Sequence, residues 1–248
     1  MIKDSLLILY MNFLISIGPR VPGSKAHKDL RTFLLKEFKK IGFESEVDSF
    51  KKDGYKFYNL VFKKGEKDFI LLGTHYDTKP GIEGANDSGS GVLLLLYLAN
   101  MLKDFKENFL FVFFDGEDFG EGAPLYGSKH FAEKNRYKIK YGIIFDMIGD
   151  KNLEIYMEGY SYESAKDLTV SLFDFAEKRN FNFMFKEVKY YIIDDHLPLL
   201  EKGIRTSLLI DFDYPYWHTE EDTWEKISLE SIKKVGVFFI EYLKERKP

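Results

Sequence analysis

The sequence predicts an α/β domain in which helices cover both faces of a central, mostly parallel sheet. Short apolar runs of strand length alternate with longer segments of helical period over most of the 248 residues. No repeat, low-complexity tract or linker interrupts this alternation, and 45% hydrophobic residues are ample for one large core. We therefore expect a single three-layer α/β/α domain over residues 1–248, with an antiparallel hairpin at one side of its sheet.

The N-terminal segment 5–18, SLLILYMNFLISIG, is apolar enough to pass for the core of a signal peptide. It is too short to span a bilayer, Asn12 interrupts it, and no small-x-small cleavage site follows. We predict a buried first helix over residues 5–17 and keep a targeting segment as the alternative. The next segment, 24–42, places its apolar residues on one helical face, with Ser24 as N-cap and Gly42 as stop.

The remaining elements follow from apolar runs, helical periodicity and turn residues. Two strands flank the Asp53-Gly54 turn, which suits a hairpin. The predicted strands cover residues 43–50, 55–62, 68–75, 109–115, 141–149, 153–158 and 205–212. The predicted helices cover residues 88–105, opening near Asp87, and residues 126–134, 161–180, 195–203 and 228–245.

Charge and composition exclude several classes of partner. The net charge of -4, from 36 basic and 40 acidic residues, gives no electrostatic footprint for nucleic acid, and we expect neither a nucleic-acid nor a membrane partner. Without cysteine, any transition metal must be bound by histidine and carboxylate side chains. We expect a cytoplasmic protein, or a secreted or periplasmic one if an upstream signal segment was removed; the oligomeric state stays open.

Polar residues gather directly after the predicted strands. His75 ends one apolar run, Glu117 and Asp118 follow the next, and Asp146 and His218 follow two more. Ligands of open α/β sheets bind at the carboxyl ends of the strands, so these segments are expected to converge on one pocket. Adjacent carboxylates at the end of a buried strand repel one another, so we expect a positive group beside them.

Each of these residues also has a simple structural explanation. Asp87 alone is explained by a helix N-cap, the sequence DGED by a solvated turn, and His75 by an ordinary hydrogen bond. His27 and His130 lie within helical patterns, and we predict structural roles for them. Taken singly, no residue establishes a site.

Taken together, a series of motifs resembles a known family. The motifs occur in one order and nearly fill the chain: GPRVPGS, GTHYDTKP, GANDSGSG, FFDGED, LYGSKHFA, FDMIGD, DDHLPLLEKGI and YWHTEEDT. This series resembles the zinc-dependent glutaminyl-peptide cyclotransferases (glutaminyl cyclases) and the related zinc aminopeptidases that share their fold.

The resemblance implies a set of metal ligands. Asp87, Asp118 and His218 match the residues that bind one zinc ion. In the two-metal aminopeptidases, the positions of His75 and Asp146 complete a second site, with the first carboxylate bridging. Cyclases keep both positions although a single zinc suffices, so we expect one zinc ion and keep two as the alternative. Asp118 departs from the glutamate frequent at its position, and zinc accepts either carboxylate.

The resemblance also implies catalytic and substrate-binding residues. Glu117 matches the general acid/base. Asp194 resembles the acid that joins Glu117 and Asp146 in a hydrogen-bond network, and shared protons would raise one pKa towards neutrality. Trp217 resembles the tryptophan that lines the glutamine pocket.

Two reactions fit these residues. In a cyclotransferase, zinc polarises the γ-carboxamide of an N-terminal glutamine, while Glu117 takes a proton from the attacking α-amine and returns it to ammonia. In an aminopeptidase, Glu117 deprotonates a metal-bound water. Trp217, Asp194 and two of the motifs favour cyclisation, whereas NDSGSGV and Ile193 favour the aminopeptidases. A binding protein that has lost catalysis is less favoured, because every ligand position keeps a suitable residue.

Overall fold

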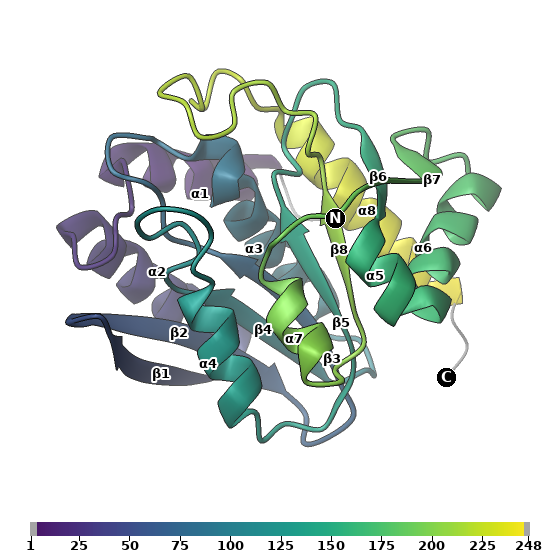
Figure 1. Ribbon diagram of the computed structural model, residues 1–248, viewed down its shortest axis with the longest axis horizontal. Helices are drawn as coiled ribbons and strands as arrows, with labels where there is room; N and C mark the ends of the chain where they lie inside the picture. The colour runs from purple at the N-terminus through teal and green to yellow at the C-terminus, as the bar shows by residue number, and fades with distance from the viewer. Residues whose placement is uncertain (1–3, 246–248) are drawn as a thin grey trace.

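A six-stranded mixed sheet forms the centre of the molecule, in the order β1-β2-β4-β3-β5-β8 (Figure 1). The computed structural model describes residues 4–245; residues 1–3 and 246–248, which the predicted domain includes, lie outside the described part. The strands of the sheet are β1 (Glu44–Lys52), β2 (Tyr55–Lys64), β3 (Phe69–His75), β4 (Phe109–Phe114), β5 (Ile139–Asp146) and β8 (Thr206–Ile210). The last four run parallel, and the β1-β2 hairpin lies antiparallel along one side. The predicted fold class is confirmed.

Two layers of helices cover the two faces of this sheet. Every side chain of β3 and β4 is buried, because alternate residues of each strand face opposite helix layers. Leu72 and Phe111 pack into the larger core, which includes α1 (Asp4–Ile17), α2 (Lys25–Ile41), α3 (Gly91–Leu102), α6 (Lys166–Lys178) and α8 (Leu229–Glu245). Leu71 and Val112 pack into the smaller core, which includes α4 (Tyr126–Lys134) and α7 (His196–Glu201).

The predicted helices at the N-terminus are present, with one correction. Ser24 caps α2 by accepting the amide of His27 at 3.1 Å, and Gly42 ends it in the left-handed conformation (φ 99°). Helix α1 buries only one face in the core, so the expected buried helix is half-buried; the exposed apolar side chains are Ile8, Leu9 and Ile15. No helix among residues 4–245 is long and apolar enough to cross a membrane.

The helix predicted over residues 161–180 is wrong as one element. The structure has α5 (Gly159–Ser164) and α6, separated at Ala165, whose dihedral angles (φ -136°, ψ 45°) are not helical. The predicted strand 153–158 corresponds to β6 (Ile155–Glu158), which pairs in parallel with β7 (Met184–Tyr190) in a small second sheet. Strand β7 was not predicted, because charged residues interrupt its apolar ones and only Met184 is buried.

The helix predicted to open near Asp87 begins later. Residues Ala85–Ser90 form an irregular π-helical turn, η1, in which Asp87 and Ser88 have non-helical dihedral angles, and α3 starts at Gly91. Asp87 is therefore not the N-cap of α3. Its carboxylate is free to face the carboxyl ends of the strands.

Candidate active site

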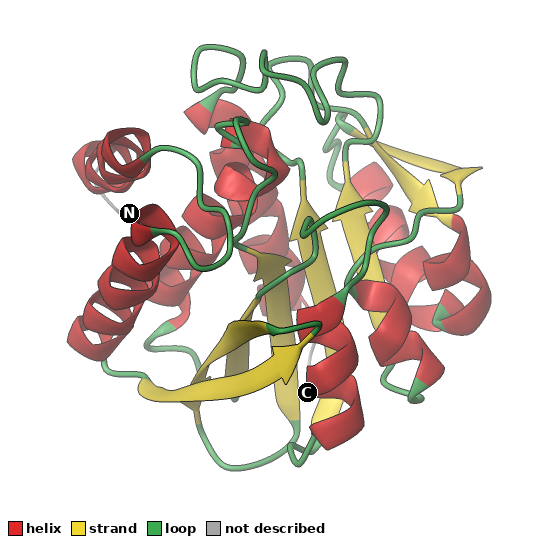
Figure 2. Cartoon of the chain, turned by 60° about the vertical axis from the view of Figure 1, so that its left-hand side comes forward, coloured by secondary structure: helices red, strands yellow, loops and turns green. Residues whose placement is uncertain are grey.

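The loops that follow β3, β4, β5 and β8 gather at one end of the sheet (Figure 2). They surround a cavity of about 400 Å³, a size that suits a small substrate. The cavity is lined by all the residues predicted as catalytic, as substrate-binding or as ligands of the first metal: Asp87, Glu117, Asp118, Asp146, Asp194, Trp217 and His218. His75 lies next to Asp87, fully buried at the end of β3.

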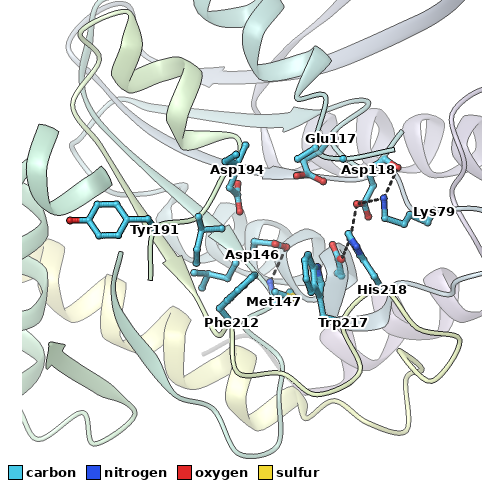
Figure 3. A pocket seen from close by; sticks show the side chains of 16 residues that line it. Lys79, Glu117, Asp118, Asp146, Met147, Tyr191, Asp194, Phe212, Trp217 and His218 are labelled. Atoms are coloured by element: carbon cyan, nitrogen blue, oxygen red, sulfur yellow. Dashed lines mark hydrogen bonds and ion pairs between the residues drawn. The ribbon is translucent and has the colours of Figure 1, made fainter. Parts of the chain in front are cut away.

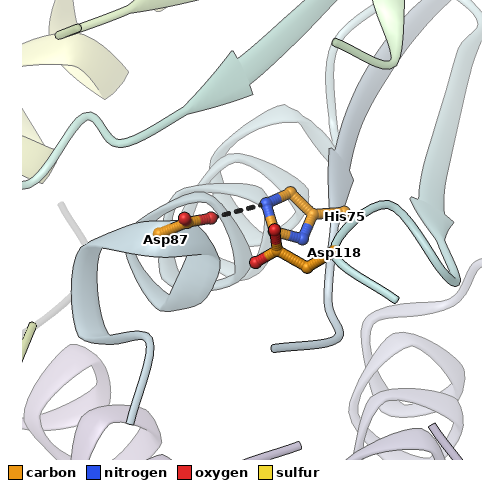
Figure 4. A group of neighbouring side chains, drawn as sticks. All are labelled: His75, Asp87 and Asp118. Carbon is orange, nitrogen blue, oxygen red and sulfur yellow. Dashed lines mark ion pairs between the residues drawn. The ribbon is translucent and has the colours of Figure 1, made fainter. Parts of the chain in front are cut away.

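Asp87 lies between two imidazoles, with one carboxylate oxygen towards each. Its Oδ1 is 2.9 Å from His75 Nε2 (Figure 4), and its Oδ2 is 3.3 Å from His218 Nε2. On the first side, Asp146 Oδ1 is 3.4 Å from His75 Nε2. On the second, Asp118 Oδ1 is 2.9 Å from His218 Nε2. Asp87 thus lies between two groups of side chains, His75 with Asp146 on one side and His218 with Asp118 on the other.

The chemistry of this cluster fits a zinc ion. Ligand atoms of His75, Asp87 and Asp118 lie within 4.8 Å of one another, and nitrogen and carboxylate oxygen are ordinary zinc ligands. Both ring nitrogens of His75 are buried without a hydrogen bond of acceptable geometry, although Nε2 lies close to two carboxylates. Burial alone would lower the pKa of His75, but Asp146, Asp77 and Asp87 raise it well above its ordinary value. A cation is thus strongly favoured among these acids.

The carboxylates on the other side of the cavity have raised pKa values. Burial and the charge of Asp118 raise the pKa of Glu117 well above its ordinary value. Burial and the charge of Asp146 raise the pKa of Asp194 to about 7. Glu117 and Asp194 both point into the cavity (Figure 3). In the described part of the chain these acids influence one another through charge and not through a direct hydrogen bond. Carboxyl groups with pKa values near neutrality are suited to accept and return protons.

Asp77 holds the segment that carries Glu117 and Asp118. Its carboxylate accepts three backbone amides, from Gly116 at 3.0 Å, Glu117 at 3.2 Å and Asp118 at 3.1 Å. Gly116 has a left-handed backbone (φ 80°) and lies against the ring of Phe57, so the tight turn needs glycine there. We did not predict this role for Asp77; the only sequence signal was its place two residues after His75.

Asp222 supports the segment of Asp87 in the same way. Its oxygens accept the amides of Asn86 at 2.9 Å and Asp87 at 3.1 Å, and the hydroxyl of Tyr214 at 2.8 Å. Asp222 lies four residues after His218 and is fully buried. This role was also not predicted, because an acid within TEEDT has the sequence appearance of a solvated loop residue.

The positive groups expected beside the acids are Lys79 and the histidines. Lys79 Nζ lies 3.4 Å from Asp118 Oδ1, the same oxygen that His218 Nε2 contacts (Figure 3). Asp115, the first acid after β4, lies apart from the cavity: its Oδ1 contacts His27 Nε2 at 3.0 Å and its Oδ2 accepts the amide of Tyr58. This buried pair gives His27 a structural role, and His130 pairs with Asp48 away from the site.

Aromatic side chains form one edge of the cavity. The indole of Trp217 stacks on the ring of His218 with centroids 4.2 Å apart. The ring of Phe212 packs against the indole, with centroids 5.1 Å apart. Trp217 is 42% exposed although it is large and apolar. Its position fits a side chain that covers a bound substrate beside the metal cluster.

Comparisons with known proteins agree with this geometry. The model of peptidase family M28 matches residues 59–243. The glutaminyl-peptide cyclotransferase of Drosophila melanogaster is 28% identical over 91% of this chain and 77% of its own length. The solved structure of glutaminyl cyclase from Porphyromonas gingivalis is similar, with a TM-score of 0.92 and 26% identity over 98% of each chain.

A leucine aminopeptidase precursor from Bacteroides thetaiotaomicron is almost equally similar in structure. Its TM-score is 0.91, with 28% identity over 99% of this chain and 98% of that chain. The fold likeness therefore includes proteins named for both reactions. The chain belongs to peptidase family M28, and its predicted membership of the glutaminyl cyclase family within the zinc aminopeptidase-like superfamily is confirmed.

Proposed function

We propose that this protein is a zinc-dependent glutaminyl-peptide cyclotransferase that converts the N-terminal glutamine of peptides to pyroglutamate and releases ammonia. The observation that carries the proposal is the arrangement of the cavity. A carboxylate with a raised pKa, Glu117, faces it beside the His218, Asp118 and Asp87 cluster, and Trp217 covers the same edge.

Asp87, Asp118 and His218 are the proposed ligands of the metal. When bound there, zinc supplies Lewis-acid chemistry that makes the γ-carboxamide carbon of the substrate more electrophilic. Asp77 and Asp222 hold the backbone of Asp118 and Asp87 through their amides, and Lys79 contacts the Asp118 carboxylate.

Glu117 is the proposed proton carrier. It takes a proton from the α-amine as the amine nitrogen attacks the γ-carboxamide carbon, and the new C–N bond closes the ring. Glu117 then returns the proton to the departing nitrogen, and the C–N bond of the carboxamide breaks to give ammonia. Asp194 and Asp146 face the same cavity and stabilise the positive charge that develops on the α-nitrogen during the attack.

An aminopeptidase is the second candidate, and a specific observation favours it. His75 and Asp146 lie close together on the far side of Asp87, and they are the residues that would hold a second metal. With two ions, Glu117 would deprotonate a water and the peptide bond would be hydrolysed. A protein without catalysis fits less well, because the site keeps an acid/base group and a complete ligand set.

The products of a glutamine-terminated peptide separate these functions. Zinc-loaded protein is incubated with a peptide that begins Gln-Leu, and the products are followed by mass spectrometry. Loss of one ammonia from an intact chain supports cyclisation. Release of free glutamine would contradict it and support the aminopeptidase, and an unchanged peptide would count against both.

A further inference from the structure

One wall of the cavity rests on the start of α5. This wall consists of residues 191–194, which lie between β7 and α7 and include Ile192, Ile193 and Asp194. The carboxylate of Glu158, the last residue of β6, accepts the amide of Ile192 at 3.1 Å. It also accepts the amide of Tyr160 at 2.9 Å, and the amide and hydroxyl of Ser161 at 2.7 Å each. A single buried side chain thus joins the wall to the N-terminus of α5.

His196 adds a second link between the same elements. Its Nε2 lies 2.9 Å from Glu158 Oε2, and both side chains are 0% exposed. His196 is the first residue of α7 and follows Asp194 by two positions. Burying a carboxylate is costly unless it is paired and hydrogen-bonded, and Glu158 has both kinds of partner. The pair therefore fixes both ends of the short segment that bears Asp194.

Tyr191 anchors the wall from outside the cavity. Its ring extends away from the catalytic residues (Figure 3), and its hydroxyl donates to Glu163 Oε1 at 2.6 Å. The ring lies directly on Gly159, where an added Cβ would come within 2.5 Å of it, and it meets the ring of Tyr160 edge-on at 5.1 Å. Residues 158–163 are thus shaped to receive this segment.

The proposed metal ligands come from other parts of the fold. His75 ends β3, Asp87 lies in η1, Asp118 follows β4 and His218 follows β8, and the contacts that hold Asp118 and Asp87 come from Asp77 and Asp222. None of these contacts involves residues 158–163. A loosened wall should therefore alter substrate binding while the metal cluster stays intact.

We propose that residues 158–163, which we call the α5 platform, position the substrate-facing wall 191–194, with Glu158 and His196 as positioning residues. Their effect on turnover rests on the proposed function, since it acts through Asp194 and the adjoining wall. Whether the platform positions the wall can be tested without measuring turnover.

The first test compares Glu158→Ala and Glu158→Gln with the wild type. In Glu158→Ala the amide of Ile192 loses its acceptor, and its hydrogen exchange should accelerate about tenfold or more, the factor expected for one lost hydrogen bond. KM for the Gln-Leu peptide should rise by about the same factor, while zinc affinity stays within about twofold of wild type. Glu158→Gln keeps an oxygen acceptor and should recover most of the protection and of KM.

Two further variants keep the test decisive if Glu158→Ala fails to fold. Gly159→Ala, at a buried position, displaces the exposed ring of Tyr191 and should raise KM without affecting zinc. The matched control is Leu34→Ala, which removes a fully buried apolar side chain of α2 from the larger core and touches neither the platform nor the wall. It should lower stability and leave KM unchanged.

The proposal is overturned if Ile192 exchange stays at the wild-type rate in Glu158→Ala, or if zinc affinity falls as much as KM rises. A rise of KM in Leu34→Ala equal to that in Gly159→Ala would also overturn it, because a general loss of stability would then explain both. If the wild type does not cyclise the peptide, the proposed function fails. The role of the platform is then still tested by the hydrogen exchange of the Ile192 amide and by the zinc affinity of the variants.

Discussion

The carboxylate of Asp77 offers a quantitative test of how the site is built. It accepts three amides of the segment 116–118, two through Oδ1 and one through Oδ2. Asp77→Ala leaves these donors without an acceptor in a buried region, at about 1–3 kcal/mol each. Water that enters the vacated space can accept some of these hydrogen bonds and so reduces the loss. The free energy of unfolding should therefore fall by roughly 3–6 kcal/mol.

Asp77→Asn separates the hydrogen bonds from the volume of the side chain. With its oxygen in the place of Oδ1, asparagine keeps two of the three bonds and turns an NH₂ group towards the amide of Asp118. The expected loss is about 1–3 kcal/mol. Urea unfolding of both variants in the presence of a chelator measures these values without a contribution from metal. Losses below about 1 kcal/mol in Asp77→Ala, or equal losses in the two variants, would refute the reasoning.

Three other outcomes follow from the same contacts. Asp118→Ala should abolish the rise in unfolding free energy that zinc gives the wild type, about 2.7 kcal/mol at roughly 100 times Kd, and isothermal titration should show no zinc binding. Trp217→Ala should raise KM for the peptide about tenfold, whereas Trp217→Phe should keep most of the affinity. Equal KM values for Trp217→Ala and the wild type in steady-state assays would contradict a substrate-binding role of Trp217. Burial alone would raise the pKa of Glu158, but His196 and the groups of Ser161 lower it to about 2, from an ordinary 4.5. Its contribution to stability is thus complete above pH 4.5 and is lost as the pH falls towards 2, so acid unfolding curves should fall more steeply in this range for the wild type than for Glu158→Gln.

The buried strands and their order in the chain could be predicted from sequence because burial on both faces demands continuous apolar runs. β3 and β4 are examples, and the Asp53-Gly54 turn fixed the hairpin through two residues with positive φ. β7 could not be predicted, since a strand with one buried residue and three charged ones carries no continuous apolar run. The break at Ala165 was hidden because alanine favours a helix, and tertiary packing overrides that propensity.

The site was predictable where chemistry needs a particular side chain. Acids and histidines after parallel strands meet at one end of the sheet, and the structure brings together every residue proposed from the motifs. The supporting residues were not predictable. Asp77 and Glu158 act on backbone amides, and whether a carboxylate faces such amides depends on loop geometry that spacing alone does not encode.

The central claim is that Glu117 moves the proton while its neighbours hold the metal. Zinc content and the rate of pyroglutamate formation, measured on one preparation of Glu117→Gln, test it most directly. We predict as much zinc per chain as in the wild type, with turnover lower by about 10²–10⁴-fold. A rate close to that of the wild type, or loss of zinc together with the rate, would contradict the assignment.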